Sequence, residues 1–206
     1  DYVTKPFDQV EPTARVRAHV ELRRYQKKLE VSNQRLLEIN EELREAQRKL
    51  ELAAKTDPLT QLSNRRDIIE KIEYERIRFK RNQKPFVLIL GDIDHFKAFN
   101  DTFGHDCGDF VLVSVANIMR SMIREWDQLA RWGGEEFLFL LAETDLEGGR
   151  IVAEKIRKSI ASHSYIHKDL TLSITMTFGV SMFHHYSMAI DACIKEADQA
   201  LYKGKE

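Results

Sequence analysis

The sequence contains only two cysteines among 206 residues, Cys107 and Cys193, and neither belongs to a CxxC or zinc-type spacing. This scarcity argues against a disulfide framework or a cysteine zinc site and predicts reduced thiols in a cytosolic protein. Only four prolines occur and 32% of the residues are charged, which predicts much exposed helix. The apolar content of 43% is sufficient for a hydrophobic core.

Long apolar runs and an excess of one charge sign are also missing. No run approaches the roughly 20 residues that a membrane span needs, and no signal peptide opens the chain. The net charge is −1, so no overall basic field exists that would recruit nucleic acid or an anionic membrane. We expect a soluble protein, or the soluble part of one, in which any anionic ligand is held by a local site.

Residues 21–55 carry a heptad pattern. One apolar row recurs every seven residues, at Leu22, Leu29, Leu36, Leu43 and Leu50. A weaker second row lies three positions further on, at Tyr25, Ser32, Ile39, Ala46 and Ala53. Two narrow rows flanked by charged residues predict a coiled-coil stalk that pairs in parallel with a second copy. The alternative is one amphipathic helix that folds back on its own domain.

The remaining chain predicts an α+β domain. Pro58 ends the stalk helix, Ser63 or Asn64 caps a helix running to about Asn82, and Gly133–Gly134 forms a tight turn between antiparallel strands. The elements from Pro85 follow the order β-α-α-β-β-α-β-α: strand Pro85–Ile93, helices Phe96–Asn100 and Phe110–Met122, a strand ending near Arg131, a strand from Glu135, helix Leu146–Ser162, strand Leu170–Met182 and a final helix over Ser187–Lys205. This order is close to a ferredoxin-like fold, with a central, mainly antiparallel sheet flanked by helices. Trp126 and Trp132 are expected to pack in the core.

Carboxylates gather at two predicted strand ends. Asp92 and Asp94 end one apolar strand, and Glu135 and Glu136 follow the Gly-Gly turn. If these strands are neighbours, the negative charges repel one another unless a hard divalent cation such as Mg²⁺ neutralises them. Glycines would let a ligand approach the backbone closely. The alternative is an exposed hairpin with solvated glutamates.

The stretch FKAFNDTFGHDCGD places further polar groups in one loop. Lys97 can meet a phosphate, whereas Asn100 and Asp109 can bond to the edge of a purine. Guanine presents N1–H and N2–H₂ donors, which suit a carboxylate acceptor. Adenine has no equivalent pair.

Four motifs together resemble one family. TDPLTQLSNRR, GDIDHFKAFNDTFGHDCGD, ARWGGEEF and ADQALYKGK occur in the order and spacing of the GGDEF family of diguanylate cyclases, with the GGEEF variant of the signature. The resemblance covers about Thr56 to the C-terminus. It implies a palm-type cyclase fold, and condensation of two GTP into cyclic di-GMP with release of two pyrophosphates. Because one domain binds one GTP, it also implies a homodimer of facing domains held by the coiled coil.

The resemblance also implies roles for individual residues. Two Mg²⁺ or Mn²⁺ ions per GTP site are expected on Asp92, the Ile93 carbonyl, Glu135 and Glu136. Glu136, with Glu135, is the expected catalytic group that activates the ribose 3′-OH. The implied substrate-binding residues are Phe96, Lys97, Asn100, His105, Asp109, Gly133, Gly134 and Lys205. Among these, Asn100, His105 and Asp109 match the guanine and ribose contacts, and the backbone of Phe96 and Lys97 with the Lys205 ammonium matches the triphosphate cradle.

REWD, with Arg124 and Asp127, matches the RxxD site at which family members bind the inhibitory product. The alternative is an arginine at a helix end that caps the turn or pairs with the aspartate. The family often adds an arginine on the next helix, and Lys155 lies near that place.

The N-terminal segment resembles the end of a response-regulator receiver domain, with Lys5–Pro6 as its Lys-Pro pair. The implied organisation is a receiver remnant over 1–20, a coiled-coil stalk over 21–55 and the cyclase domain over 56–206. It implies a cytoplasmic bacterial two-component protein controlled by a histidine kinase. A silent GGDEF module that binds GTP or cyclic di-GMP is the first alternative, since the chain stops before the family's usual Gly-Arg-Asn. A cyclase making mixed cyclic GMP–AMP is the other, disfavoured by retention of Asp109.

Overall fold

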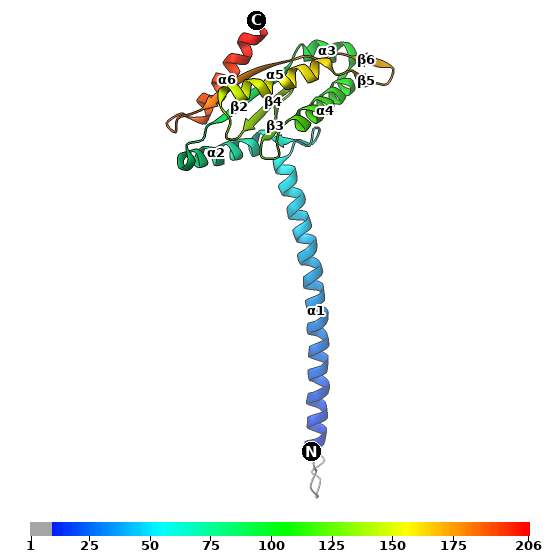
Figure 1. The fold of residues 1–206 in the computed structure, drawn as a ribbon. Helices are drawn as coiled ribbons and strands as arrows, with labels where there is room; N and C mark the ends of the chain where they lie inside the picture. Colours follow the sequence, from blue (N-terminus) through cyan, green and yellow to red (C-terminus); the bar gives the residue numbers. More distant parts are fainter. Residues whose placement is uncertain (1–9) are drawn as a thin grey trace. The chain divides into compact units, whose positions relative to one another are not determined.

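The computed structural model describes residues 10–206, in two compact units, one ending at Glu51 and the other spanning Leu52–Glu206. The Lys5–Pro6 pair therefore lies outside the described residues. Helix α1 (Val10–Lys55) is uninterrupted over 46 residues (Figure 1). No helix within residues 10–206 is both long and apolar enough to cross a membrane.

The predicted heptad rows are exposed along α1. Their large apolar members have 50–71% of their surface exposed: Leu22, Tyr25, Leu29, Leu36, Ile39, Leu43 and Leu50. The first unit by itself therefore presents an unburied apolar stripe. Such a stripe is typical of a helix that pairs with another helix.

The second unit is built on a five-stranded mixed sheet in the order β1-β3-β4-β2-β7. Its strands are β1 (Ser63–Asn64), β2 (Phe86–Ile93), β3 (Gln128–Gly133), β4 (Glu136–Leu141) and β7 (Met176–Phe183). Only the β1–β3 pair is parallel. Strand β2 is internal and buried on both faces, as its continuous apolar run predicts. The order of the four long strands is that of a ferredoxin-like fold, so the expected fold class is confirmed.

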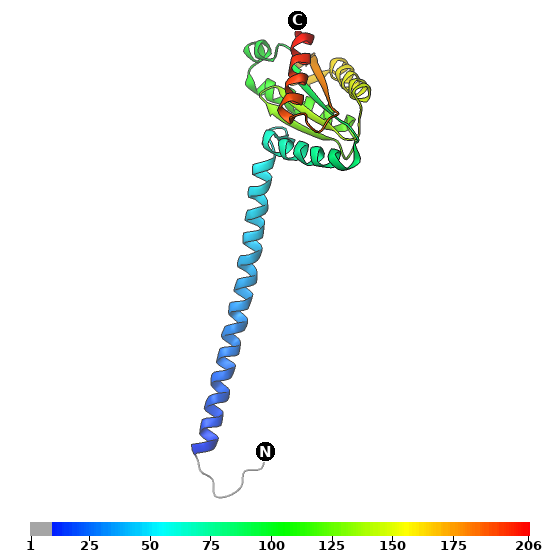
Figure 2. The same cartoon turned by 90° about the vertical axis from the view of Figure 1, so that its left-hand side faces the viewer.

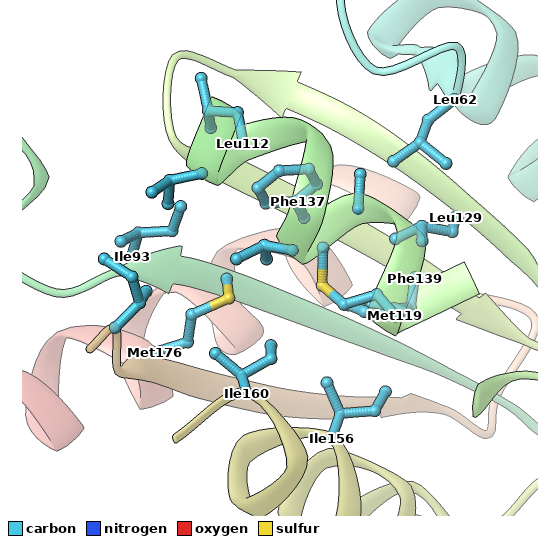
Figure 3. Packing of buried hydrophobic residues seen from close by; sticks show 14 of the residues in the cluster. Leu62, Ile93, Leu112, Met119, Leu129, Phe137, Phe139, Ile156, Ile160 and Met176 are labelled. Carbon is cyan, nitrogen blue, oxygen red and sulfur yellow. The ribbon is translucent and has the colours of Figure 1, made fainter. Parts of the chain in front are cut away.

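Helices cover both faces of this sheet (Figures 1 and 2). They are α2 (Arg65–Asn82) and α6 (Ile190–Lys205) on one face, with α4 (His105–Met122) and α5 (Leu146–Ser162) on the other; the short α3 (Phe96–Phe103) precedes α4. Side chains of β2 alternate accordingly: Leu88 packs with α2 and α6, whereas Ile89 packs with α4 and α5. Figure 3 shows Phe137 and Phe139 of β4 among residues of α4 and α5.

Local signals fix the helix ends. The Asn64 side chain accepts a hydrogen bond from the Asp67 N–H at 3.0 Å and is the N-cap of α2, one of the two predicted caps. Gly134 has a φ of +47° in the turn between β3 and β4, a conformation that favours glycine. The predicted Gly-Gly hairpin is thereby confirmed.

Two expectations about the elements are wrong, one strand was missed, and the expected burial of one tryptophan is wrong. The stretch FKAFNDTFGHDCGD, expected as one loop, lies in α3 and in the first turns of α4. The strand predicted over Leu170–Met182 is divided: β6 (Leu170–Leu172) pairs with β5 (Tyr165–His167) in a separate small hairpin, and β7 begins at Met176. The strand β1 was not expected, because two residues carry no periodicity. Trp126 is exposed rather than in the core, whereas Trp132 is half-buried beneath the Arg65 guanidinium, at 4.2 Å.

Gly179 allows α6 to lie directly on β7. A Cβ at this position would be 2.0 Å from the Ala197 carbonyl oxygen and 2.4 Å from the Leu201 nitrogen. Gly179→Ala is therefore expected to lower the free energy of unfolding by about 1–3 kcal/mol, because backbone cannot yield as a side chain does. Chemical denaturation measures this. Gly133→Ala is the control, because its Cβ would meet nothing closer than 3.8 Å; equal losses would contradict the packing argument.

Candidate active site

Strand register brings the predicted carboxylates together. Asp92, near the end of β2, lies opposite Glu136, the first residue of β4. The Ile93 N–H donates to the Glu135 carbonyl oxygen at 3.4 Å, which ties the hairpin to the end of β2. Asp92, Glu135 and Glu136 are each half-buried. The sheet therefore holds acidic side chains from two strands at one edge.

Negative charge at this edge is only partly neutralised. Burial, followed by the charges of Asp92, Asp198 and Glu135, raises the pKa of Glu136 above its usual value, and Lys205 opposes this shift. The Lys205 ammonium donates to Asp92 Oδ1 in an ion pair. Asp198 was not anticipated from the sequence; like Lys205, it lies on α6.

Asp94 does not join this acidic group. Its carboxylate accepts hydrogen bonds from Thr175 Oγ1 at 2.7 Å and Thr177 Oγ1 at 2.8 Å. Its N–H donates to the Thr175 carbonyl oxygen at 3.0 Å. Asp94 thus fastens the loop after β2 to the start of β7, which corrects the expectation that it adds charge to the cluster.

The donor set suits a hard divalent cation. Within residues 10–206, no three His, Cys, Asp or Glu side chains converge closely enough to form a complete metal site. Mg²⁺, however, is usually held by only one or two carboxylates together with substrate phosphates. Asp92 and Glu136 supply two such oxygen donors on paired strands, and the raised pKa of Glu136 marks charge that a cation would compensate.

A cleft of about 490 Å³ lies beside these carboxylates. It is lined by Phe96, Lys97, Asn100, Asp101, His105, Asp109, Leu112, Arg131, Gly134 and Glu135. Seven of these ten residues are ones predicted from the sequence to bind substrate or metal. Five other residues predicted to bind substrate or metal do not line the cleft: Asp92, Ile93, Gly133, Glu136 and Lys205. Glu136 directly follows the lining residue Glu135 and lies opposite Asp92, which forms the ion pair with Lys205.

Asn100 has an unused hydrogen-bonding group at this cleft. Its Oδ1 is buried and has no hydrogen-bond partner among the described residues. A buried polar atom without a partner is costly unless something fills that role. Gly108 makes room for this amide, because a Cβ there would lie 1.9 Å from Asn100 Oδ1.

Gly108→Ala is expected to raise the KM for GTP, the substrate that the sequence resemblance implies, about tenfold or more, by displacing the Asn100 amide from the cleft. Stability should fall little, because the clash is with the end of a movable side chain. Steady-state kinetics and thermal unfolding measure the two effects separately. Ser114→Ala is the control on the same helix, since Ser114 does not line the cleft; an unchanged KM in Gly108→Ala would refute the positioning role.

Arg131 and Asp57 also belong to this region and were not predicted. Arg131 Nε donates to the Gly134 carbonyl oxygen at 2.9 Å, and its Nη1 lies 3.3 Å from both Asp57 carboxylate oxygens. Asp57 also accepts hydrogen bonds from the N–H and the hydroxyl of Thr60, at 2.8 and 2.7 Å. Burial alone would raise the pKa of Asp57, but Thr60 and Arg131 hold it below its usual value. The turn after α1 is therefore linked to the Gly-Gly hairpin.

The RxxD segment, Arg124–Asp127, forms a turn before β3 and does not line the cleft. The Arg124 N–H donates to Asp127 Oδ2 at 3.1 Å, and the Asp127 N–H donates to the Arg124 carbonyl oxygen at the same distance. The contact is to backbone, so Asp127 caps the turn while the Arg124 side chain stays exposed. Burial raises the pKa of Asp127. Lys155 lines a different groove, along α5 and β7.

The fold and site define an α+β domain whose paired acidic strand ends adjoin a polar cleft with a buried, unpartnered amide. Residues 54–206 match the family model described as diguanylate cyclase, GGDEF domain, and the chain belongs to this family. The predicted resemblance is confirmed at that level.

Relatives and solved structures give the same result. The chain is 45% identical over 152 residues to diguanylate cyclase DgcP of Pseudomonas aeruginosa, covering 74% of this chain and 22% of the relative. It is 33% identical over 207 residues to response regulator PleD of Caulobacter vibrioides, covering 100% of this chain and 42% of the relative. It therefore spans less than half the length of these relatives. The crystal structure of the coiled coil and GGDEF domain of DgcB from Caulobacter crescentus, in complex with c-di-GMP, is 28% identical with a TM-score of 0.76, covering 90% of this chain and 94% of that one.

Proposed function

We propose that this chain condenses two GTP into cyclic di-GMP with release of two pyrophosphates. The observation that carries the proposal is the register of Asp92 against Glu136 beside a cleft lined by predicted nucleotide contacts. Membership in the diguanylate cyclase family supports the same reaction. Phosphoryl-type transfer needs alignment and charge neutralisation more than covalent chemistry, and this site offers both kinds of group.

The cleft holds one GTP. Asp109 and Asn100 accept and donate hydrogen bonds at the guanine edge, and His105 lies with them on the side of the base and ribose. The backbone of Phe96 and Lys97 and the ammonium of Lys205 hold the triphosphate. Gly133 and Gly134 leave room for close approach, because no side chain projects from the turn. Asn100 Oδ1 gains the partner that it lacks in the protein alone.

Glu136 accepts the proton of the attacking ribose 3′-OH, assisted by Glu135. A raised pKa makes its carboxylate a stronger base than an ordinary glutamate. Asp92, the Ile93 carbonyl and the two glutamates would hold two Mg²⁺ or Mn²⁺ ions. When bound, these ions supply neutralisation of phosphate charge and polarisation of the reacting oxygens.

The active form is a homodimer paired through α1. One domain carries one cleft for one GTP, whereas the reaction joins two nucleotides, so two domains must face each other. The exposed heptad rows of α1 support a parallel coiled coil, and the similarity to the coiled coil and GGDEF domain of DgcB supports the same organisation. Each domain then experiences the other at a high effective concentration.

Two features are proposed to regulate the reaction, a product site before β3 and the N-terminal segment. Arg124 and Asp127 form a product site at which cyclic di-GMP inhibits, supported by an exposed arginine beside a turn that is already formed. Residues 1–20 resemble the end of a receiver domain, the kind of domain that a histidine kinase phosphorylates. The similarity of the whole chain to a protein named as a response regulator supports this organisation.

The test is incubation of the chain with Mg²⁺ and GTP, alone and with added ATP, followed by separation of the nucleotides and mass spectrometry. Cyclic di-GMP and pyrophosphate that rise faster than linearly with protein concentration are expected. A variant with Leu29 and Leu36 both changed to Asp should remain folded but lose dimer and product together. Leu37→Asp, also exposed on α1 but outside the two heptad rows, is the matched control. Absence of product at all protein concentrations would overturn the proposal in favour of a silent binding module, and mixed cyclic GMP–AMP would overturn the substrate assignment.

A further inference from the structure

Trp126 is a large aromatic residue placed at the surface. Its indole has 62% of its surface exposed, although it follows Arg124 by only two residues and precedes the buried Asp127. Tryptophan usually buries most of its surface, and an exposed indole often marks a binding site. The turn that Asp127 caps holds this residue at the edge of a groove.

The groove has two lobes within the second unit. One lobe, of about 510 Å³, is lined by Arg120, Arg124 and Asp127, among others. The other, of about 360 Å³, is lined by Trp126, Tyr74 and Arg78, among others. The two lobes share the wall residues Lys55, Asp67, Lys71 and Gln128.

The two lobes differ in chemistry. In the first, neither Arg120 nor Arg124 forms an ion pair with any described residue, so both guanidinium groups are available for phosphate or a purine edge. In the second, Trp126 and Tyr74 offer exposed aromatic faces, on which a base can stack. The Arg124 Cζ lies 5.9 Å from the centroid of the Trp126 ring, which places a cation at the junction of the lobes.

We infer that Trp126 stacks on a guanine base of cyclic di-GMP bound in this groove. A ligand with two bases joined by two phosphates matches an arginine lobe and an aromatic lobe whose common wall contains Lys55 and Lys71, with Asp67 between them. This inference rests on the product site of the proposed function and adds to it the residue between Arg124 and Asp127 that holds the base. Trp126 does not line the GTP cleft, so it acts on product affinity alone.

Fluorescence gives a direct test, because the chain has only two tryptophans, Trp126 and Trp132. A Trp132→Phe variant reports Trp126 alone, and its emission should be quenched saturably on titration with cyclic di-GMP. In equilibrium dialysis, Trp126→Ala should weaken cyclic di-GMP binding at least about fivefold, as expected for loss of one base stack. Trp126→Phe should retain most of the affinity, because it keeps an aromatic face. Ile77→Ala is the matched control, since Ile77 is exposed on the same helix as Tyr74 but does not line the groove.

The outcomes distinguish failure of this inference from failure of the proposed function on which it rests. If Arg124→Ala weakens binding but Trp126→Ala does not, the product site stands and the role of Trp126 is refuted. If the unaltered chain makes cyclic di-GMP but does not bind it at this groove, the product site and this inference both fail while the cyclase stands. Emission of Trp126 that depends on protein concentration and not on the ligand would also overturn the inference, in favour of a contact between two copies.

Discussion

Glu136→Gln is expected to reduce cyclic di-GMP synthesis about a thousandfold, as typical for loss of a general base, and to raise the melting temperature at pH 7. The two effects have one cause. Glu136 lies half-buried opposite Asp92, where its negative charge serves the reaction but is poorly compensated in the free protein. Functional sites commonly keep groups that destabilise the fold. Removing the charge of Glu136 is therefore expected to stabilise the folded protein and to abolish the function of the site.

The pH dependence fixes the sign of the stability effect. The pKa of Glu136 is raised in the folded state, so the folded protein binds this proton more tightly than the unfolded chain. The stability of the unaltered protein therefore falls as pH rises through the raised pKa of Glu136. The increase in melting temperature caused by Glu136→Gln is fully present above that pKa. Below about pH 4.3, the ordinary pKa of glutamate, both states carry the proton and the gain disappears. Thermal unfolding of both proteins between pH 4 and 8, without added metal, measures this.

Glu143→Gln is a control of opposite sign. Hydrogen bonding from Lys84, with a smaller contribution from Arg78, lowers the pKa of Glu143. Its ionised form therefore stabilises the fold above the ordinary glutamate pKa, and that stabilisation is lost as pH falls through the lowered value. Glu143→Gln should slightly lower the melting temperature at pH 7 and leave the reaction intact. If Glu136→Gln also lowers the melting temperature at pH 7, the charge of Glu136 does not destabilise the folded protein.

The elements of the fold that are local in sequence could be predicted, and those that depend on distant partners could not. A short stretch of sequence is enough to predict the heptad rows of α1, the apolar run of β2 or the Asn64 cap. The hairpin of β5 and β6 was missed because its strands have only three residues each. Exposure of Trp126 could not be predicted, because an apolar residue type does not reveal whether a neighbour covers it.

The candidate site divides in the same way. Asp92 and Glu136 could be paired from topology, because adjacent antiparallel strands bring their ends together. The partners of Asp94 are Thr175 and Thr177, more than 80 residues away, and nothing in either stretch indicates the contact. The same is true of Asp57 and Arg131, which are 74 residues apart. Polar contacts between residues far apart in the sequence produce no periodic pattern from which they could be predicted.

The contact of Asp57 with Arg131 is linked to the hairpin that carries Glu135 and Glu136, the proposed catalytic residues. Asp57 lies in the turn directly after α1, and Arg131 reaches from it to the Gly134 carbonyl oxygen. Both side chains are largely shielded from solvent, at 16% and 19% exposure, so the ion pair is not a freely solvated one. A single side chain therefore connects the turn after α1 with the backbone of the turn before Glu135.

Arg131→Gln is accordingly expected to lower kcat/KM by up to about a hundredfold, the effect that a misplacement of about 1 Å can have on catalysis. The loss should lie mainly in kcat, and Asp57→Asn should reproduce much of it. The double variant should be little worse than Arg131→Gln, because both changes break one connection, and a double-mutant cycle measures that coupling.

Lys71→Gln is the matched control for this prediction. It removes another ion pair of the same domain, that of Lys71 with Asp67 at 2.8 Å; both residues bond to Ser63 of β1, and neither bonds to the Gly133–Gly134 turn. It should cost stability without changing kcat. Additive losses in the double variant, or a loss of kcat in Lys71→Gln as large as in Arg131→Gln, would show that the hairpin is positioned by the stability of the domain as a whole. Coupled losses specific to Asp57 and Arg131 would instead show that this contact positions the hairpin for the proposed reaction.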